Sequence, residues 1–274
     1  MATLKEIQNC ELQILKTVVD ICERHNINYY LADGTLLGAV RHNGFIPWDD
    51  DIDIFMGYDD LKKFKKICKK ELPNKYFFQD YETDPGANWI FTKIRDNDTY
   101  MPEFGIERSK DLTINEGIWI DIFPLLDVAT DYSKMIKQIE YIFKFQHSIV
   151  RISDYKKRHF TSFKSKLIIL YMNAKYRIKS NYYKKRFEKL QCKNSDLVIG
   201  MGNAYWDTLS EKSMNKALSK TINKSWLEPQ KLPFEGFEFD CFVEYDKYLK
   251  TIYGEDYMTP KRWTHLEDYS DVIV

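Results

Sequence analysis

The residues best suited to chemistry lie in one acidic run, Trp48-Asp49-Asp50-Asp51-Ile52-Asp53-Ile54. Alternation of side-chain type over residues 51–56 predicts a half-buried strand. Asp51 and Asp53 are two residues apart, so they project from the same face of that strand. Two adjacent carboxylates repel each other, and a divalent cation that prefers oxygen ligands, Mg²⁺ or Mn²⁺, removes the repulsion. The spacing therefore favours a metal site.

A third acid, Asp121, stands alone in the apolar run 117–123, which is typical of a buried strand. A carboxylate inside such a strand is costly unless it is paired with a cation or bound to a metal. If this strand lies beside the first one, the carboxylates of Asp51, Asp53 and Asp121 converge on one point. Three converging carboxylates are typical of metal-assisted phosphoryl chemistry.

A glycine-bracketed turn, Gly34-Thr35-Leu36-Leu37-Gly38, precedes the acidic run and leads into a short helix. Glycine allows close backbone approach, and Thr35 at a helix N-terminus can bond a phosphate oxygen. Taken singly, Gly-x-x-x-Gly is common packing and an Asp-rich tetrapeptide is usually a solvated turn. Together they favour a phosphate site. The sequence contains no Walker A, Rossmann or kinase motif, and no Ser/His/Asp hydrolase motif stands out.

Basic side chains near these motifs are candidates for phosphate contacts. Arg41 could bind phosphate oxygens with its planar fork, or could balance a neighbouring aspartate in a salt bridge. Lys93 and Arg95 share one face of the predicted strand 88–95 and could meet donor phosphates, or could lie on an exposed face. His42 is interpreted as a structural hydrogen-bonding residue.

Apolar periodicity predicts a mixed α/β chain. Helices are expected over 3–25, 59–71, 131–152, around 167–178 and over 244–253, and strands over 28–32, 51–56, 76–81, 88–95, 117–123 and 237–243. Asp59 is the expected N-cap of the second helix. We divide the chain into a catalytic core over 1–129, a mainly helical basic insertion over 130–235, and a C-terminal segment over 236–274 that returns to the core.

Charge is unevenly distributed in a chain that is neutral overall, with 41 Lys and Arg against 41 Asp and Glu. Residues 156–193 contain 13 Lys or Arg and one acid, Glu188. A solvated helix surface is the ordinary explanation of such a stretch. The functional alternative is a basic amphipathic helix lying on an anionic membrane. Nucleic acid is the weaker option, because no DNA- or RNA-binding module is recognisable.

Other features set limits on compartment and cofactor. No apolar run reaches 18 residues, which argues against a spanning helix, and the N-terminus lacks the apolar core of a signal peptide. Five widely spaced cysteines without a Cys-x-x-Cys pair argue against structural zinc and a disulfide framework. We therefore expect a cytoplasmic protein.

The motifs resemble those of the LicD family, relatives of fukutin within the polymerase-beta-type nucleotidyltransferase superfamily. The resemblance rests first on the run from Asp33 to Asp53, which contains Gly34-Thr35 and Asp51-Ile52-Asp53-Ile54. Later motifs are resembled by residues 117–124 and 253–258, with Pro260 and His265. The resemblance is dense over 26–57, recurs over 88–124 and 249–265, and lapses over 130–235.

The resemblance implies a nucleotidyltransferase-like core with a mixed sheet and a specific reaction. A phospho-alcohol group, best known as phosphocholine, passes from a CDP-linked donor such as CDP-choline to a sugar hydroxyl of a surface glycan, such as teichoic acid or lipopolysaccharide. By motif position, Asp51 and Asp53 would hold two Mg²⁺ (or Mn²⁺) ions, and Asp121 would complete the site and deprotonate the acceptor. Gly34 and Thr35 would cradle the diphosphate.

Several residues, the donor and the reaction each have more than one interpretation. Asp49 is a metal ligand or a supporting acid, and His265 anchors a loop or takes part in catalysis. The rings of Trp48, Trp89 and Trp119 pack in the core or bind a quaternary ammonium. The donor could be CDP-glycerol or CDP-ribitol, the reaction could be true nucleotidyl transfer, or the chain could be a silent nucleotide- or sugar-binding protein. A lipid-linked acceptor would place the enzyme peripherally on the inner membrane face, and no nucleic-acid partner is expected.

Overall fold

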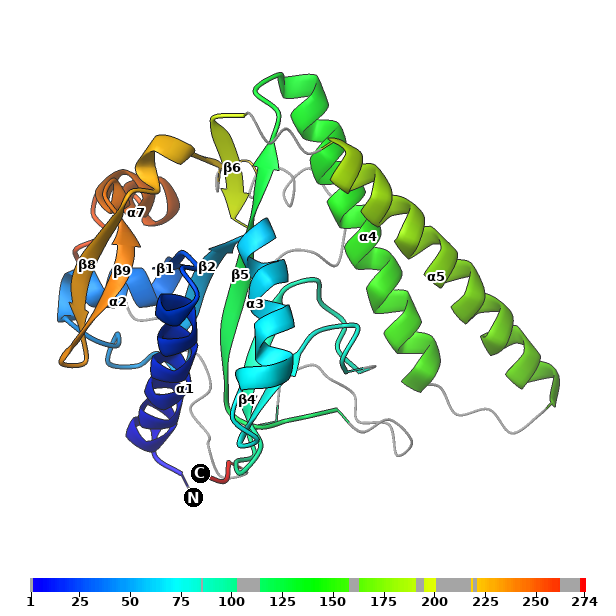
Figure 1. The fold of residues 1–274 in the computed structure, drawn as a ribbon, viewed down its shortest axis with the longest axis horizontal. Coiled ribbons are helices and arrows are strands. Elements are labelled where there is room, and N and C mark those ends of the chain that lie inside the picture. The colour runs from blue at the N-terminus through cyan, green and yellow to red at the C-terminus, as the bar shows by residue number, and fades with distance from the viewer. Residues whose placement is uncertain are drawn as a thin grey trace.

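A mixed β-sheet runs through the centre of the molecule in the computed structural model (Figure 1). The structure describes residues 2–84, 86–102, 114–157, 163–190, 195–200, 218, 221–261 and 272–274. Five strands follow one another in the order β1 (Tyr29–Leu31), β2 (Asp53–Gly57), β5 (Trp119–Val128), β4 (Thr92–Asp96) and β3 (Tyr76–Gln79). Among the described strands, β2 and β5 pair in parallel and all other pairs are antiparallel. The expected mixed α/β class is confirmed.

Helices α1 (Leu4–Arg24) and α3 (Tyr58–Glu71) lie beside each other against the sheet (Figure 1). Helix α1 begins in a capping box, in which the Thr3 hydroxyl accepts from the Glu6 N–H and the Glu6 carboxylate accepts from the Thr3 N–H. The expected N-cap of α3 is wrong. The helix begins one residue earlier, at Tyr58, with Gly57 as N-cap, so Asp59 lies in the first turn, where an acid complements the helix dipole.

Helix α2 (Asp33–His42) contains both glycines that were expected to form a turn before it. The chain then turns at Asn43, whose φ of 55° is left-handed, and folds back along the helix. A Cβ on Gly38 would lie 2.5 Å from the backbone oxygen of Gly44. The loop that carries the acidic run can therefore approach α2 only because residue 38 has no side chain.

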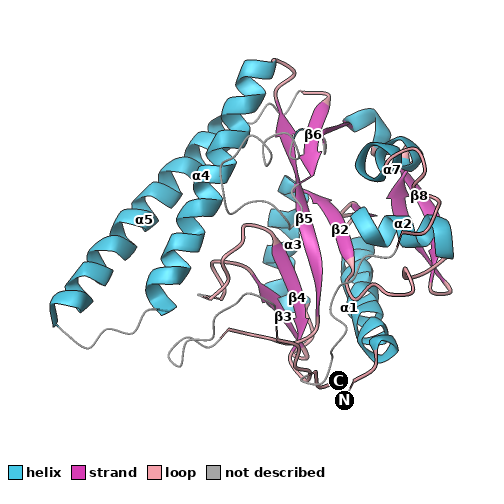
Figure 2. Cartoon of the chain, turned by 180° about the vertical axis from the view of Figure 1, so that it is seen from behind, coloured by secondary structure: helices cyan, strands magenta, loops and turns pink. Residues whose placement is uncertain are grey.

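Helices α4 (Tyr132–Lys157) and α5 (Phe163–Leu190) form a long antiparallel hairpin at one side of the sheet (Figure 2). The Gln138 side chain on α4 joins the two helices by donating to the Leu190 carbonyl on α5 at 2.5 Å, and it accepts from the N–H of Ala129, which precedes α4, at 2.7 Å. After the hairpin, β6 (Leu197–Gly200) pairs with β5, and β7 (Thr221–Asn223) pairs with β6. No helix in the described ranges is both long and apolar enough to cross a membrane.

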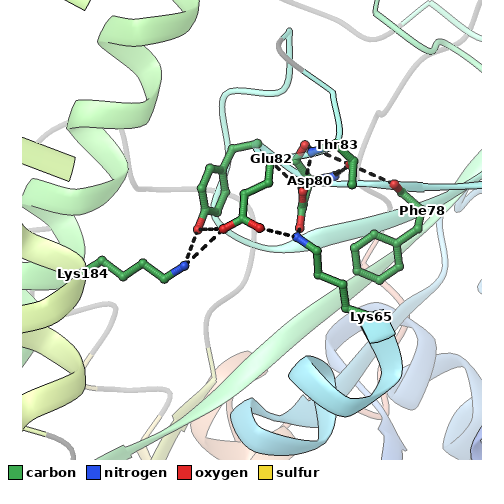
Figure 3. Close-up of polar contacts among 7 residues, drawn as sticks. Lys65, Phe78, Asp80, Glu82, Thr83 and Lys184 are labelled. Carbon is green, nitrogen blue, oxygen red and sulfur yellow. Dashed lines mark hydrogen bonds and ion pairs between the residues drawn. The ribbon is translucent and has the colours of Figure 1, made fainter. Parts of the chain in front are cut away.

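A polar network fixes the hairpin to the core (Figure 3). Lys184 on α5 donates to the Glu82 carboxylate at 3.2 Å, and Lys65 on α3 donates to the other oxygen of Glu82 at 2.7 Å. Lys65 also pairs with Asp80, whose backbone N–H donates to the Thr83 hydroxyl at 2.9 Å. Burial would raise the pKa of Glu82, but the ammonium groups of Lys65 and Lys184 lower it to about 2.

The C-terminal part returns to the sheet through the hairpin of β8 (Pro229–Phe234) and β9 (Phe237–Phe242), followed by α7 (Tyr245–Tyr253). A 3-10 turn over Lys224–Trp226 precedes the hairpin, and the Tyr30 hydroxyl of β1 donates to the Leu227 carbonyl beside it at 2.6 Å. The ring of Tyr248 on α7 packs edge-on against Phe55 of β2, with centroids 6.0 Å apart. These contacts place α7 next to the start of the acidic strand.

Candidate active site

Two of the predicted site acids face each other across neighbouring strands. Asp53, the first residue of β2, is in register with Asp121 of β5. Register partners on paired strands point from the same face of the sheet, so the two carboxylates adjoin. On the other side of β5, Asp121 is in register with Lys93 of β4. The expectation that the two acidic strands are neighbours is confirmed, and a row of Asp53, Asp121 and Lys93 crosses the sheet.

Asp51 precedes β2, because the strand starts two residues later than expected. The ladder to β5 nevertheless reaches back to residue 52, whose carbonyl accepts from the Asp121 N–H at 2.8 Å. Asp51 and Asp53 are half-buried, whereas Asp121 is buried. The acids thus extend from the sheet interior toward solvent, where a substrate can reach them.

Two contacts from helices fix the acidic loop. The Thr35 hydroxyl on α2 accepts from the Asp53 N–H at 2.8 Å, and Gln8 on α1 donates to the Asp49 carbonyl at 2.8 Å. A Cβ on Gly34 would lie 2.9 Å from Asp49 Oδ2, so the Asp49 carboxylate covers the first turn of α2. Gly34 and Thr35 therefore position the acids at the helix N-terminus. Their predicted contact with a diphosphate stays a prediction.

The cluster is electrostatically frustrated. Burial raises the pKa of Asp51 well above its ordinary value, and repulsion by Asp49, Asp50 and Asp121 raises it further, while Lys93 lowers it. Such a group of carboxylates gains free energy when a cation neutralises it. No three His, Cys, Asp or Glu side chains in the described ranges are already arranged around a metal-sized point. The oxygen donors and their mutual repulsion fit Mg²⁺, and their side chains would have to reorient to hold it.

Glu11 on α1 is a member of the cluster that the sequence analysis missed. It is 1% exposed, and its Oε2 has no hydrogen-bond partner in the part of the chain that the structure describes. Burial raises its pKa well above the ordinary value, and the nearby charges of Asp51 and Asp50 add to the effect, followed by those of Asp49 and Asp121. A sequence signal existed, because Glu11 occupies a core position between Ile7 and Ile14 at helical spacing.

Lys93 is fully buried and pairs with the Asp121 carboxylate at 3.0 Å. Its ammonium also lies 4.3 Å from the ring centre of Trp119, 5.0 Å from that of Trp89 and 5.4 Å from that of Phe91. The two tryptophans that could have bound a quaternary ammonium therefore surround a cation of the protein itself. Trp48 is partly buried and packs against the core.

Arg95 is also fully buried, and its guanidinium lies 4.6 Å from the ring centre of Trp119. It donates to the Gly117 carbonyl at 2.8 Å and to the Gln79 side chain. In this structure both basic side chains of β4 thus hold protein groups rather than facing solvent. Their contact with donor phosphates remains a prediction.

Arg41 offers a donor at the edge of the cluster. Its Nε donates to His42 Nε2 and its Nη1 donates to the Tyr257 carbonyl, both at 2.9 Å. Its Nη2 is buried and has no hydrogen-bond partner within the described ranges. Burial lowers the pKa of Arg41, while Tyr253 and Asp49 oppose that change. His42 makes a hydrogen bond to Arg41, as its structural interpretation requires.

Tyrosines of α7 close the site, which the sequence analysis did not anticipate. The Tyr248 hydroxyl donates to Asp33 Oδ1 at 2.5 Å. Burial raises the pKa of Tyr253, and the charges of Asp33 and Asp53 raise it further, so this phenol lies within electrostatic reach of the cluster. His265 lies outside the described residues.

Clustered carboxylates on adjacent strands, next to a glycine-containing helix and buried cations, are typical of enzymes that handle phosphate groups. Residues 26–164 match the family described as LicD/FKTN/FKRP, nucleotidyltransferase domain. The chain belongs to this family, and it is an enzyme of the phosphotransferase class.

Named relatives agree with this assignment. The chain is 29% identical over 269 residues to the lipopolysaccharide cholinephosphotransferase LicD of Haemophilus influenzae, covering 93% of this chain and 91% of the relative. A shorter match, 43% identical over 50 residues, links it to the ribitol 5-phosphate transferase FKRP of Homo sapiens, covering 18% of this chain and 10% of the relative. An uncharacterized protein of Rickettsia prowazekii, RP689, is 48% identical over 111 residues, covering 34% of this chain and 40% of the relative.

Proposed function

We propose that the chain transfers phosphocholine from CDP-choline to a sugar hydroxyl of a cell-surface glycan precursor, such as lipopolysaccharide or teichoic acid. The observation that carries the proposal is the register pairing of Asp53 with Asp121 beside Asp51. The alignment with a lipopolysaccharide cholinephosphotransferase over 93% of the chain supports the choice of transferred group.

The cation in the proposal is Mg²⁺ or Mn²⁺, two ions held by Asp51, Asp53 and Asp121, with Asp49 as a further ligand. When bound, these ions would neutralise the charge of the donor diphosphate and of the departing CMP. The proposal is supported by the repulsion that raises the pKa of Asp51. Glu11 adds a buried carboxylate whose pKa the charges of Asp51 and Asp50 raise further.

The chain's own residues orient the reactants. The Nη2 of Arg41, which has no hydrogen-bond partner among the described residues, and the first turn of α2 at Gly34 and Thr35 would receive the donor phosphates. The acceptor oxygen then bonds to the choline-bearing phosphorus, and the bond from that phosphorus to CMP breaks, with the electron pair leaving on CMP. The acceptor proton passes to a carboxylate of the cluster, for which we propose Asp121.

Ribitol phosphate is the second candidate for the transferred group. The 43% identity to the ribitol 5-phosphate transferase covers only 50 residues, so it bears on the motif region rather than on the whole chain. CDP-ribitol and CDP-glycerol share the cytidine diphosphate with CDP-choline, and the acidic cluster does not distinguish them. Selection of the alcohol therefore depends on residues outside the cluster.

A panel of donors tests the proposal. The purified chain is incubated with Mg²⁺ and a lipopolysaccharide-type acceptor, together with CDP-choline, CDP-ribitol or CDP-glycerol, and CMP release is measured. We expect acceptor-dependent CMP release that is fastest with CDP-choline. Faster release with CDP-ribitol would favour the second candidate, and pyrophosphate release from CTP without CMP release would show nucleotidyl transfer instead.

A further inference from the structure

The outer surface of α5 exposes a row of large apolar side chains. Leu167 is 51% exposed, Leu170 67%, Tyr171 65% and Ile178 71%. Leu167, Tyr171 and Ile178 recur at spacings of four and seven residues, so they lie on one stripe of the helix. The stripe covers residues 167–178, and Lys185 and Lys189 continue the same side of the helix beyond it. On the opposite side of α5, Ser180 and Phe187 are buried, which leaves the apolar stripe facing away from the rest of the molecule.

Basic residues flank this stripe on both sides. At 100° per residue, Lys166 and Arg177 lie along one flank, and Lys175 and Lys179 lie along the other. The ammonium of Lys175 lies 6.0 Å from the ring centre of Tyr171, so charge and ring adjoin. Over the whole helix nine Lys or Arg stand against one acid, Glu188. Long basic side chains beside an apolar stripe are typical of a helix that lies in a membrane interface.

We propose that α5 docks on the surface of an anionic lipid bilayer, with its apolar stripe in the headgroup region and its basic flanks against acidic headgroups. Charge complementarity selects this occupant. Two copies of α5 would bring like charges together, and a nucleic acid or acidic glycan would leave the exposed Leu and Ile side chains in water. The many charges of α5 keep it on the surface of the bilayer. This inference stands independently of the donor and acceptor proposed above.

Vesicle co-sedimentation tests it with the full chain and without any substrate. One set of vesicles is phosphatidylcholine alone and the other contains phosphatidylglycerol, each at low and high salt. We expect binding to the anionic vesicles that high salt weakens. Equal binding to both vesicle types, or no binding to either, would overturn the inference.

Matched variants locate the surface. Replacing Lys166, Lys175 and Lys179 with Gln should weaken binding about a hundredfold, because each Lys near an anionic surface contributes about 1 kcal/mol. Replacing Lys66, Lys69 and Lys70 with Gln removes equal charge from exposed positions of α3 and should change binding far less. Equal effects of the two triple variants would overturn the assignment to α5.

A second pair of variants tests the apolar stripe. Leu170→Ser with Ile178→Ser should weaken binding at least about tenfold, whereas Ile273→Ser, at an exposed position outside α5, should not. These positions are exposed, so circular dichroism should show unchanged folding for each variant. Wild-type binding by the Leu170→Ser/Ile178→Ser variant would overturn the proposal. The proposal would also be overturned if the wild type does not bind vesicles and light scattering shows that it is a dimer which the Leu170→Ser/Ile178→Ser variant converts to a monomer.

Discussion

Glu11 is a buried carboxylate whose surroundings indicate how the acidic cluster functions. It is buried among aspartates, and one of its oxygens lacks a partner within the described part of the chain, which is unfavourable in the folded protein. Its helical spacing is compatible with burial but does not show that it joins an acidic cluster, since the acids that surround it come from distant parts of the sequence. Its position is explained if a cation joins the cluster during function.

Replacing Glu11 with Gln tests that explanation. Burial raises the pKa of Glu11, which favours the protonated form of the side chain, and Gln resembles that form closely. We expect the metal-free stability to change by less than about 1 kcal/mol. Mn²⁺ raises the Tm of a protein that binds it, and we expect this rise to be smaller in Glu11→Gln. Each tenfold loss of Mn²⁺ affinity removes about 1.4 kcal/mol of the stabilisation. An unchanged Mn²⁺-induced shift would remove Glu11 from the cation site.

Lys93 offers a second test at the residue scale. Lys93→Met removes the ammonium that pairs with the buried Asp121 carboxylate, which should cost about 3–5 kcal/mol in urea unfolding. Adding Asp121→Asn removes the buried charge with which Lys93 pairs and should recover most of that loss. If the double variant is as unstable as the single one, the aromatic packing around Lys93, rather than the ion pair, accounts for the cost.

At the scale of elements, the close approach of α2 to the acidic loop positions the site. Gly38→Ala places a methyl group against the Gly44 carbonyl, whose backbone cannot move without displacing the loop. We expect a loss of about 1–3 kcal/mol and a lower turnover. Gly34→Ala is the matched control, because its methyl group meets only the end of the Asp49 side chain, which can rotate away. A Gly38→Ala variant as stable as Gly34→Ala would contradict this account.

Local sequence patterns predicted the helices and strands that carry the acids. They did not predict which strands pair when these lie far apart in the sequence. The alternation after Asp51 predicted β2, and helical spacing predicted α1. The strands β6 and β7 have four and three residues and pair only with distant partners, so the sequence contained no comparable signal. Lys93 and Arg95 are buried against side chains of other strands, such as Trp119 of β5 and Gln79 of β3, which the sequence of β4 alone does not show.

At the scale of the whole molecule, the α4–α5 hairpin is attached to the core through Glu82. Its folded pKa of about 2 lies below the ordinary value of about 4.3. The stability that the ionised Glu82 side chain contributes is therefore present above about pH 4.3 and is lost as the pH falls toward 2.

The pH dependence of Glu82→Gln follows from this sign. Because half of the Glu82 side chain is exposed, we expect Glu82→Gln to cost no more than about 1 kcal/mol at pH 7. The difference in Tm between wild type and Glu82→Gln should shrink as the pH is lowered from 5 to 3. Glu238→Gln, at an exposed position of β9, is the control. A deficit that stays constant over this range would show that the ion pairs of Glu82 contribute nothing.

Charge separation also characterises the whole molecule. A neutral chain places acids at the start of β2 and bases along α5, so each surface can act on a different partner. At the acidic surface we expect phosphotransfer that depends on Asp53 and a divalent cation.

CMP release by wild type and by Asp53→Asn measures this dependence on Asp53. The substitution keeps the size of the side chain and removes its charge, and the exposed Asp98→Asn is the matched control. With CDP-choline, acceptor and Mg²⁺, we expect Asp53→Asn to fold normally and to release CMP at least about a thousandfold more slowly, while Asp98→Asn matches wild type. Wild-type CMP release by Asp53→Asn, or wild-type release that persists after removal of divalent cations, would contradict the account.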